Sequence, residues 1–334
     1  MNNLELTVIV PTRNRPVSLA ETVSCMSRQE LSPAAYEIVV IDDGSVPPVV
    51  LPQNQPGPQL TVVRRCYGER SGARNAGAAA ARGNIIVFVD DDITVHSDFL
   101  LRHLDAHHRW PGALVVGSVA LPSEQMPKPF VRFRQKLEQS GIPESEGPTA
   151  VPNLCTAANM SIKRDDFQAI GGFDTDIVSG EDQDFAFRHR RRGGTIAFLP
   201  EAIATHRDTA LTIRTYCRRV EWGSRHLIPF CRRYPDWPDN VEREVVNGAL
   251  SWGCEPIALS LRKAAKSAMY LTACREPLFI MAAVLEGIAP RSKALERLYR
   301  TLIGVHIFRG YREGLADDCS DIRLAPATET ASAD

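Results

Sequence analysis

The sequence lacks several features that would decide its class at once. Its eight cysteines include no CxxC pair, which argues against a zinc ribbon or a disulfide framework, and reduced cytosolic thiols are expected instead. No apolar run reaches the roughly 18 residues of a membrane span. The longest such run extends only from Pro277 to Leu285. The opening segment MNNLELTVIV has no basic stretch, so no signal peptide is expected.

The chain also lacks an excess of charge of either sign. It has 39 Lys and Arg residues against 40 Asp and Glu residues, for a net charge of −1. This balance argues against a strongly basic nucleic-acid-binding protein, and no nucleic-acid partner is expected. With 334 residues, 44% of them hydrophobic, the composition is typical of a globular protein with one large α/β domain or two domains.

Hydrophobic runs alternate with helical patterns over the first 120 residues. The runs predicted as strands are residues 6–10, 37–41, 60–64, 85–89 and 113–120. Helices are predicted from Pro16, where Ser18 and Glu21 have capping-box spacing, and over residues 71–82 and 98–108. This alternation predicts an α/β fold with a mostly parallel, Rossmann-like sheet flanked by helices. Ligands of such sheets bind beyond the carboxyl ends of the strands.

The later part of the chain has a different composition. Residues 121–152 are rich in Pro, Gly, Ser and Glu and are predicted to form a long loop or lid. A helix over residues 185–192 and a strand over residues 195–199 are expected next. From about residue 210 to about residue 316 the pattern is helical, and the polar tail is expected to be disordered.

Three adjacent aspartates, Asp90, Asp91 and Asp92, directly follow the apolar run 85–89. Carboxylates crowded at a buried strand end repel one another and lose solvation, and a divalent cation relieves both costs. Asp90 and Asp92 have D-x-D spacing, and hard oxygen ligands suit Mg²⁺ or Mn²⁺. The alternative interpretation is a helix N-terminus, where Asp is favoured.

Two other segments allow two interpretations each. Asp42 and Asp43 end a strand, where a carboxylate is able to accept a hydrogen bond from a base or a ribose hydroxyl, or where Asp and Gly form a turn. Residues 71–77 surround Arg74 with small side chains. This arrangement suits phosphate binding by the guanidinium or simple close packing of a helix against the sheet.

Glu181 and Asp182 stand at the start of a predicted helix. Ser179 and Asp182 have spacing similar to a capping box, so one interpretation is helix capping. The other is a general base that the helix start directs at an active site. His206 follows a predicted strand and is either a structural histidine or a metal ligand.

Arginine is concentrated in the segment from residue 207 to residue 233. The seven arginines are Arg207, Arg214, Arg218, Arg219, Arg225, Arg232 and Arg233. They form a solvated helix face, a phosphate-binding surface or a contact with anionic lipid. The apolar helix around residues 277–288 either supports such a lipid contact or belongs to the core.

Taken in chain order, these motifs resemble glycosyltransferase family 2. The matching segments are VIVPTRN (8–14), IDDGS (41–45), ARNAG (73–77), FVDDD (88–92), GGFD (171–174), EDQD (181–184) and His206. Each is short, but all seven occur in the family's order over about residues 5–210. The resemblance implies the GT-A fold and an inverting transfer of a sugar from a nucleoside-diphosphate sugar to an acceptor hydroxyl.

The resemblance also implies roles for individual residues. Those that would line the nucleotide-sugar pocket are Pro11, Thr12, Arg15, Asp43, Arg74, Asp90 and Asp91. The implied ligands of the divalent metal, Mn²⁺ or Mg²⁺, are Asp92, Asp90 and His206. Asp182 matches the family's catalytic base, and Glu181 lies beside it.

The same resemblance implies an organisation and a location. Residues 1–120 would bind the nucleotide sugar, residues 121–210 would bind the acceptor, residues 211–320 would be helical and residues 321–334 disordered. UDP is the base expected first, with dTDP and GDP left open. The acceptor is left open among a lipid-linked saccharide, a polysaccharide, a small metabolite and a peptide. A cytoplasmic location is expected, with peripheral contact of the C-terminal helices with the inner membrane face as one interpretation.

Two other functions fit part of the pattern. A hydrophobic strand followed by Asp90, Asp92 and Thr94 also resembles the first motif of haloacid-dehalogenase-like phosphatases, in which Asp90 would be the nucleophile. That hypothesis leaves Asp43, Arg74 and His206 without a role. The second alternative is a sugar-nucleotide-binding protein without catalytic activity, against which the intact set of acids argues.

Overall fold

The computed structural model describes residues 4–51, 56–140, 142–143, 145–149, 155–207 and 211–324. The chain divides into two compact units, residues 1–209 and residues 210–334, which are described separately below. The finer four-part organisation expected from the sequence stays a prediction. Most of the tail that was expected to be disordered, residues 325–334, lies outside the described residues.

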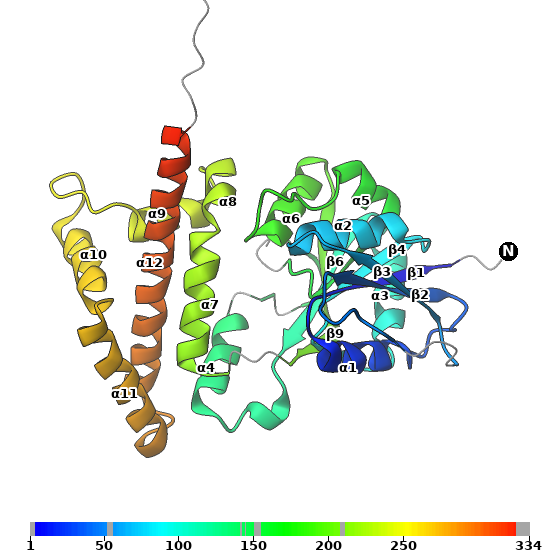
Figure 1. The fold of residues 1–334 in the computed structure, drawn as a ribbon, viewed down its shortest axis with the longest axis horizontal. Helices are drawn as coiled ribbons and strands as arrows, with labels where there is room; N and C mark the ends of the chain where they lie inside the picture. Colours follow the sequence, from blue (N-terminus) through cyan, green and yellow to red (C-terminus); the bar gives the residue numbers. More distant parts are fainter. Residues whose placement is uncertain are drawn as a thin grey trace, which may run out of the picture. The chain divides into compact units, whose positions relative to one another are not determined.

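The first unit is built on a nine-stranded sheet with helices on both faces (Figure 1). Its strands are β1 (Leu6–Thr12), β2 (Tyr36–Asp43), β3 (Gln59–Arg65), β4 (Ile85–Val89), β5 (Ile93–Val95), β6 (Ala113–Ala120), β7 (Gly147–Thr149), β8 (Asn159–Lys163) and β9 (Thr195–His206). Their order is β3-β2-β1-β4-β8-β6-β9-β5, with β7 paired to β9. The strands β1 to β4 are parallel, as expected from the sequence, but β8 runs antiparallel between β4 and β6, so the sheet is mixed.

Both faces of the sheet are buried, which is why its central strands are continuously apolar. The helices of this unit are α1 (Pro16–Met26), α2 (Arg70–Ala80), α3 (Phe99–Arg109), α4 (Pro129–Glu138), α5 (Arg164–Ile170) and α6 (Glu181–Arg191). Val8 and Val10 of β1 pack in a cluster with α1 and α3, whereas Ile9 packs on the opposite face with α2, α5 and α6. A Cβ atom on Gly77 of α2 would lie 2.3 Å from Cγ2 of Ile9. Close packing against the sheet therefore explains the small residues of α2.

Several local predictions need correction. Residues 121–152 are not a structureless loop, because their described part contains a short 3₁₀ helix (Ser123–Gln125), α4 and β7. The prediction of a capping box at Ser18 and Glu21 is wrong, since α1 begins at Pro16 and no side chain caps this helix. The predicted helix start at Glu181 is confirmed, but no side chain caps it, and Gly180 precedes it with φ of 84°.

Strand β9 is longer than the predicted strand 195–199 because it continues past an irregularity. Gly117 of β6 pairs with Leu199, and the next residue, Ser118, pairs with Ile203. Residues 200–202 thus form a bulge, after which β9 resumes and pairs with β5 in the register Ile93 with His206. The bulge and this register together carry His206 to the end of β4.

The second unit is helical, as expected. Its helices are α7 (Ile213–Arg225), α8 (Ile228–Arg233), α9 (Pro238–Asn247), α10 (Ile257–Met269), α11 (Thr272–Ile288) and α12 (Lys293–Leu324). The long helix α12 packs along α7 and also contacts α8 to α11. In the described residues no single helix is long and apolar enough to cross a bilayer. Helix α10 and residues 273–288 meet that test of length and composition only as a pair, and they are bent by 83°.

Candidate active site

The carboxyl ends of β1 and β4 bring the predicted site residues together. Asp92 follows β4, and the antiparallel pairing of β5 with β9 places His206 beside it. The Nε2 atom of His206 lies 3.1 Å from Oδ1 of Asp92. A backbone hydrogen bond of 2.8 Å from Arg207 N to the Asp92 carbonyl fixes the same junction. The two residues are 114 positions apart in sequence, so only the sheet register unites them.

Arg15, from the turn after β1, binds two of the three adjacent aspartates. Its Nη1 atom lies 2.7 Å from Oδ2 of Asp92 and 3.1 Å from Oδ1 of Asp91. Thr12 donates a hydrogen bond of 2.6 Å to the other oxygen of Asp91. The carboxylate of Asp91 is therefore held by contacts within the protein, and Thr12 and Arg15 are the residues that hold it.

The environments of Asp91 and Asp92 separate their pKa values. Burial raises the pKa of Asp91 more than Thr12 and Arg15 lower it. Burial also opposes ionisation of Asp92, but the contacts with His206 and Arg15 outweigh it and bring the pKa of Asp92 below its ordinary value. Asp92 is thus the member of the triplet that is held as an anion beside an imidazole, which is what a cation site requires.

Arg74 organises a second group of acids, which come from two distant parts of the chain. Its Nη2 atom lies 2.9 Å from Oδ1 of Asp90, and its Nη1 atom lies 3.0 Å from Oε1 of Glu181 and 3.7 Å from Oδ1 of Asp182. The Arg74 residue is 1% exposed, so this guanidinium is a buried charge that the acids neutralise. Its pKa is raised, because the neighbouring carboxylates outweigh the effect of burial.

Asp182 is the acid with the strongest shift toward the protonated form. Burial and the neighbouring charge of Glu181 raise the pKa of Asp182 to about 7, against the opposing effect of Arg74. Its Oδ1 atom is buried and has no hydrogen-bond partner in the described residues. No side chain caps α6, so the capping interpretation of Asp182 is wrong. A carboxylate with a pKa near neutrality and an oxygen that accepts no hydrogen bond is suited to accept a proton.

Asp42 and Asp43 have different local roles. Asp42 accepts hydrogen bonds from the backbone N–H groups of Ser45 at 2.8 Å and Val49 at 3.1 Å, which is the turn interpretation. Asp43 accepts hydrogen bonds from the N–H groups of Tyr67 at 2.5 Å and Gly68 at 3.1 Å through one oxygen, Oδ1. The predicted contact of Asp43 with a base stays a prediction, as does the nucleotide contact of Pro11, which is half-buried next to the last residue of β1.

The structure unites only part of the predicted metal set. Asp92 and His206 are adjacent, whereas Asp90 is turned to Arg74. Among the described ranges, no group of three His, Cys, Asp or Glu side chains is arranged to hold a metal ion. Oδ1 of Asp92 is nevertheless buried without a hydrogen bond, and it faces an imidazole. A divalent cation bound by Asp92 and His206 would complete its coordination with oxygens of phosphate and water, as is common for Mg²⁺.

Sequence reasoning missed the pairing of Arg74 with Glu181, which lies 107 residues further along the chain. The available signal was an arginine within the small-residue face of an otherwise apolar, alanine-rich helix. Such a position is buried, and a buried arginine requires acidic partners. Its predicted role toward the nucleotide stays a prediction.

Comparison with known proteins agrees with this arrangement. Residues 7–165 match the model of Glycosyl transferase family 2. Two relatives are a pre-mycofactocin glycosyltransferase of Mycobacterium tuberculosis, 25% identical over 70% of this chain and 48% of the relative, and a glucosyl-dolichyl phosphate glucuronosyltransferase of Haloferax volcanii, 29% identical over 52% of this chain and 56% of the relative. The chain thus spans about half of the length of these relatives.

Solved structures show the same fold. A mannosyltransferase, PcManGT, from Pyrobaculum calidifontis in complex with GDP-Man and Mn²⁺ aligns with a TM-score of 0.57 at 19% identity, covering 92% of this chain and 87% of that chain. TarS 1–349 from S. aureus in complex with UDP-GlcNAc aligns with a TM-score of 0.51 at 14% identity, covering 94% of this chain and 92% of that chain.

The chain therefore has a GT-A fold, as in these solved glycosyltransferases, and a helical C-terminal extension. Its residues 7–165, a little under half of the chain, match glycosyl transferase family 2. The alternative as a haloacid-dehalogenase-like phosphatase does not agree with this family match. The buried ion pair of Asp90 with Arg74 also differs from the free nucleophile that the phosphatase hypothesis required.

Arg74 gives the first testable prediction. Arg74→Ala leaves Asp90, Glu181 and Asp182 close together without their buried cation, and it should lower the free energy of unfolding by about 3–5 kcal/mol. Arg70→Ala is the matched control. Its half-exposed guanidinium lies 4.0 Å from Glu181, and its loss should cost less than about 1 kcal/mol. Urea denaturation followed by circular dichroism measures both, and equal midpoints for the two variants would contradict this role of Arg74.

Proposed function

We propose that the chain transfers a sugar from a nucleoside-diphosphate sugar to an acceptor hydroxyl in a single, inverting displacement. The observation that carries this proposal is the pair of acidic groups at one sheet edge, Asp92 with His206 and Asp182 with Glu181. One pair suits a cation, and the other contains a carboxylate whose pKa is raised to about 7. A single displacement needs one base and no covalent intermediate, which suits a site with one such carboxylate.

In this proposal Asp92 and His206 hold a divalent cation, Mn²⁺ or Mg²⁺, and Asp90 contacts the ribose or the metal. A cation there supplies Lewis-acid stabilisation of the negative charge on the departing diphosphate. Asp182 accepts the proton of the acceptor hydroxyl as the oxygen attacks the anomeric carbon. Glu181 keeps the pKa of Asp182 raised, and Arg74 positions both carboxylates.

Other residues at the same edge are proposed to bind the nucleotide. Pro11, Thr12 and Arg15 line the end of β1, and Asp43 lies at the end of β2. Arg15 exchanges its contact with Asp92 for a donor phosphate when the donor binds. UDP is the proposed base. The PcManGT structure contains GDP-Man and the TarS structure contains UDP-GlcNAc, so the fold accommodates more than one base.

Asp182→Asn tests the assignment of the base. Transfer should fall at least about 100-fold, because the amide is unable to accept the proton, whereas donor affinity should change little. In the wild-type protein kcat/KM should rise with pH through about 7, since only the deprotonated Asp182 acts as a base and its pKa is raised to about 7. Asp176→Asn, an exposed acid nearby, is the control. Wild-type turnover by the Asp182 variant would contradict the assignment of Asp182 as the base.

A second experiment tests the cation. Treatment with EDTA should abolish transfer from the donor that a thermal-shift panel of nucleotide sugars selects, and Mn²⁺ or Mg²⁺ should restore it. His206→Ala should raise the half-saturating Mn²⁺ concentration at least about tenfold because one of two side-chain ligands is lost. His108→Ala, at an exposed position, should leave it unchanged. Full transfer in EDTA would show that no metal is required.

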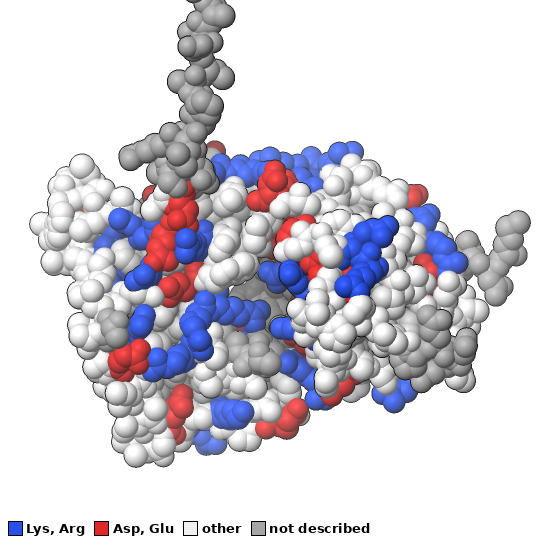
Figure 2. Space-filling model, viewed as in Figure 1, with Lys and Arg blue, Asp and Glu red and all other residues white. Residues whose placement is uncertain are grey.

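The helical unit suggests a peripheral membrane contact. Every exposed residue of α11 is uncharged: Ala273, Cys274, Pro277, Ile280, Met281, Ala283, Val284, Gly287 and Ile288. Figure 2 shows mostly white surface over α10 and α11. A helix in water ordinarily presents charged residues outward. Exposed basic residues follow α11 directly, namely Arg291, Lys293, Arg297 and Arg300.

Helix α10 also has buried charged residues and exposed apolar residues. Lys263 is 3% exposed and Lys266 is 9% exposed, whereas Ile257 is 74% and Leu261 is 57% exposed. The buried Lys263 ammonium lies 2.7 Å from Glu255. Apolar residues outside and a basic rim are the features of a helix that lies in the interface of an anionic bilayer. We propose that α10 and α11 contact the cytoplasmic face of a membrane, where a lipid-linked acceptor would be accessible.

Vesicle flotation tests the membrane contact. The protein should float with phosphatidylcholine vesicles containing phosphatidylglycerol, and the double variant Ile280→Glu/Val284→Glu should lose at least about tenfold in partition, because each apolar side chain contributes about 1.5–3 kcal/mol when buried. The control is Val17→Glu, on the exposed face of α1 in the first unit. If the double variant floats like the control, α11 is not the membrane-facing helix.

A further inference from the structure

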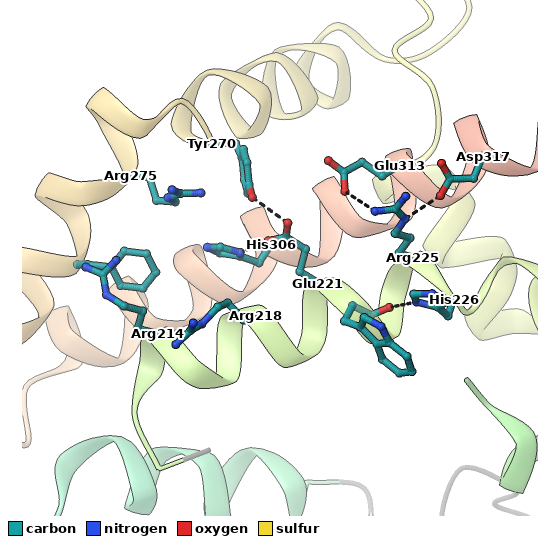
Figure 3. Close-up of a pocket in the computed structure, with 12 residues that line it drawn as sticks. Arg214, Arg218, Glu221, Arg225, His226, Tyr270, Arg275, His306, Glu313 and Asp317 are labelled. Atoms are coloured by element: carbon teal, nitrogen blue, oxygen red, sulfur yellow. Dashed lines mark hydrogen bonds and ion pairs between the residues drawn. The ribbon is translucent and has the colours of Figure 1, made fainter. Parts of the chain in front are cut away.

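The helical unit contains a pocket that the transfer reaction proposed above does not use. It has a volume of about 710 Å³, and its lining residues come from α7, the α10–α11 junction, α11 and α12. This volume is within the range of small-molecule sites. Figure 3 shows Arg214, Arg218 and Glu221 along α7, Tyr270 and Arg275 opposite them, and the His306 ring between.

The carboxylates of the pocket already have partners. Glu221 accepts a hydrogen bond of 2.8 Å from the Tyr270 hydroxyl and another from Nδ1 of His306. Asp317 accepts a hydrogen bond of 2.7 Å from Nε of Arg225. Glu313 accepts a hydrogen bond from Arg309. Both donors to Glu221 are neutral groups, and a cation that balances its charge is Arg309, whose Nε atom lies 3.7 Å from Oε1 of Glu221. Each of these acids therefore has partners within the unit.

The cations at that end are only partly neutralised. Arg218 has no hydrogen bond and no ion pair with any described residue. The acid paired with Arg275 is Glu276, 3.6 Å from its Nε atom, and both oxygens of Glu276 already accept hydrogen bonds from Arg214 at 2.8 and 3.1 Å. The Arg275 guanidinium lies over the Tyr270 ring at 5.0 Å, which fixes its orientation.

His306 provides an independent sign of a ligand. The residue is 4% exposed and lines the pocket, yet its Nε2 atom has no hydrogen-bond partner in the described part of the chain. Glu221 fixes Nδ1 as the donor, and burial lowers the pKa of His306. At neutral pH, Nε2 is therefore an acceptor that needs a hydroxyl or N–H donor.

We propose that this pocket binds a phosphorylated sugar or polyol, with Arg218 and Arg275 on the phosphate and Nε2 of His306 accepting a hydrogen bond from a hydroxyl of the same molecule. Guanidinium groups bind phosphate oxygens with charge-assisted, often bidentate hydrogen bonds. The combination of unpartnered arginine and a bare imidazole acceptor matches a ligand that carries both groups. Sulfate, an anion without a hydroxyl, would leave Nε2 without a donor.

Isothermal titration of the full chain with glucose 1-phosphate tests the proposal. Saturable binding is expected, and Arg218→Ala should weaken it at least about tenfold. Arg218 is exposed and has no partner, so its removal leaves the packing intact. Arg219→Ala, the adjacent exposed arginine that does not line the pocket, should bind as the wild type does. No saturable binding to a phosphorylated polyol in any arm, or equal affinities for the two variants, would overturn the proposal.

The variant His306→Asn tests the contact with the hydroxyl separately from the contact with the phosphate. Asparagine keeps an N–H donor for Glu221 but removes Nε2, so affinity for glucose 1-phosphate should fall several-fold while the weaker affinity for sulfate, which has no hydroxyl to donate, stays unchanged. An equal loss of affinity for both ligands would show that His306 does not accept a hydrogen bond from the hydroxyl. None of these measurements uses sugar transfer, so their failure leaves the proposed reaction untouched.

A phosphorylated polyol occurs both as a soluble molecule and as a lipid headgroup. A third experiment distinguishes these two sources of the ligand. Flotation compares phosphatidylcholine vesicles with and without phosphatidylinositol, for the wild type and for Arg218→Ala. A phosphatidylinositol-dependent increase that Arg218→Ala removes identifies a headgroup as the ligand. Binding of glucose 1-phosphate without such an increase identifies a soluble ligand. Flotation that is the same for both proteins and no binding of glucose 1-phosphate would refute the pocket as a polyol phosphate site.

Discussion

The buried guanidinium of Arg74 is the interaction on which the arrangement of acids in the first unit depends. It joins the end of β4, through Asp90, to the start of α6, through Glu181 and Asp182. Without a central cation, three carboxylates from distant segments would not remain together in a nearly dry environment. Because Arg74 also lowers the pKa of Asp182 while Glu181 and burial raise it, that pKa lies near neutrality instead of far above it.

Much of this fold follows from sequence patterns alone. β4 and β6 have the predicted bounds because each begins with four or five consecutive apolar residues that are buried in the sheet. The segment 121–152 was misjudged because Pro and Gly at its borders conceal α4, whose Pro129 occupies the first turn, where proline is tolerated. The capping box failed for a similar reason, since Pro16 begins α1 two residues before Ser18.

The site was predictable to a smaller extent. The order of the family-like motifs predicts that Asp92 and His206 lie close together. It does not predict the strand pairing that brings them together, because strand register depends on partners far apart in sequence. The acids that bind Arg74 lie 16 and 107 residues further along the chain, at Asp90 and Glu181, and no local pattern encodes these pairings. The second unit contrasts with the first. In α10, Lys263 and Lys266 are buried while Ile257 and Leu261 are exposed, which is the reverse of the usual pattern of a helix in water.

The bulge at residues 200–202 has a consequence for how this site tolerates change. Side chains alternate between faces along a strand, so the number of unpaired residues in the bulge sets the parity of everything after it. Loss of one of these residues at an unchanged length of the bulge would shift the pairing of β9 by one position and present Arg207, not His206, to Asp92. The number of residues at this point is therefore constrained, whichever amino acids occupy it.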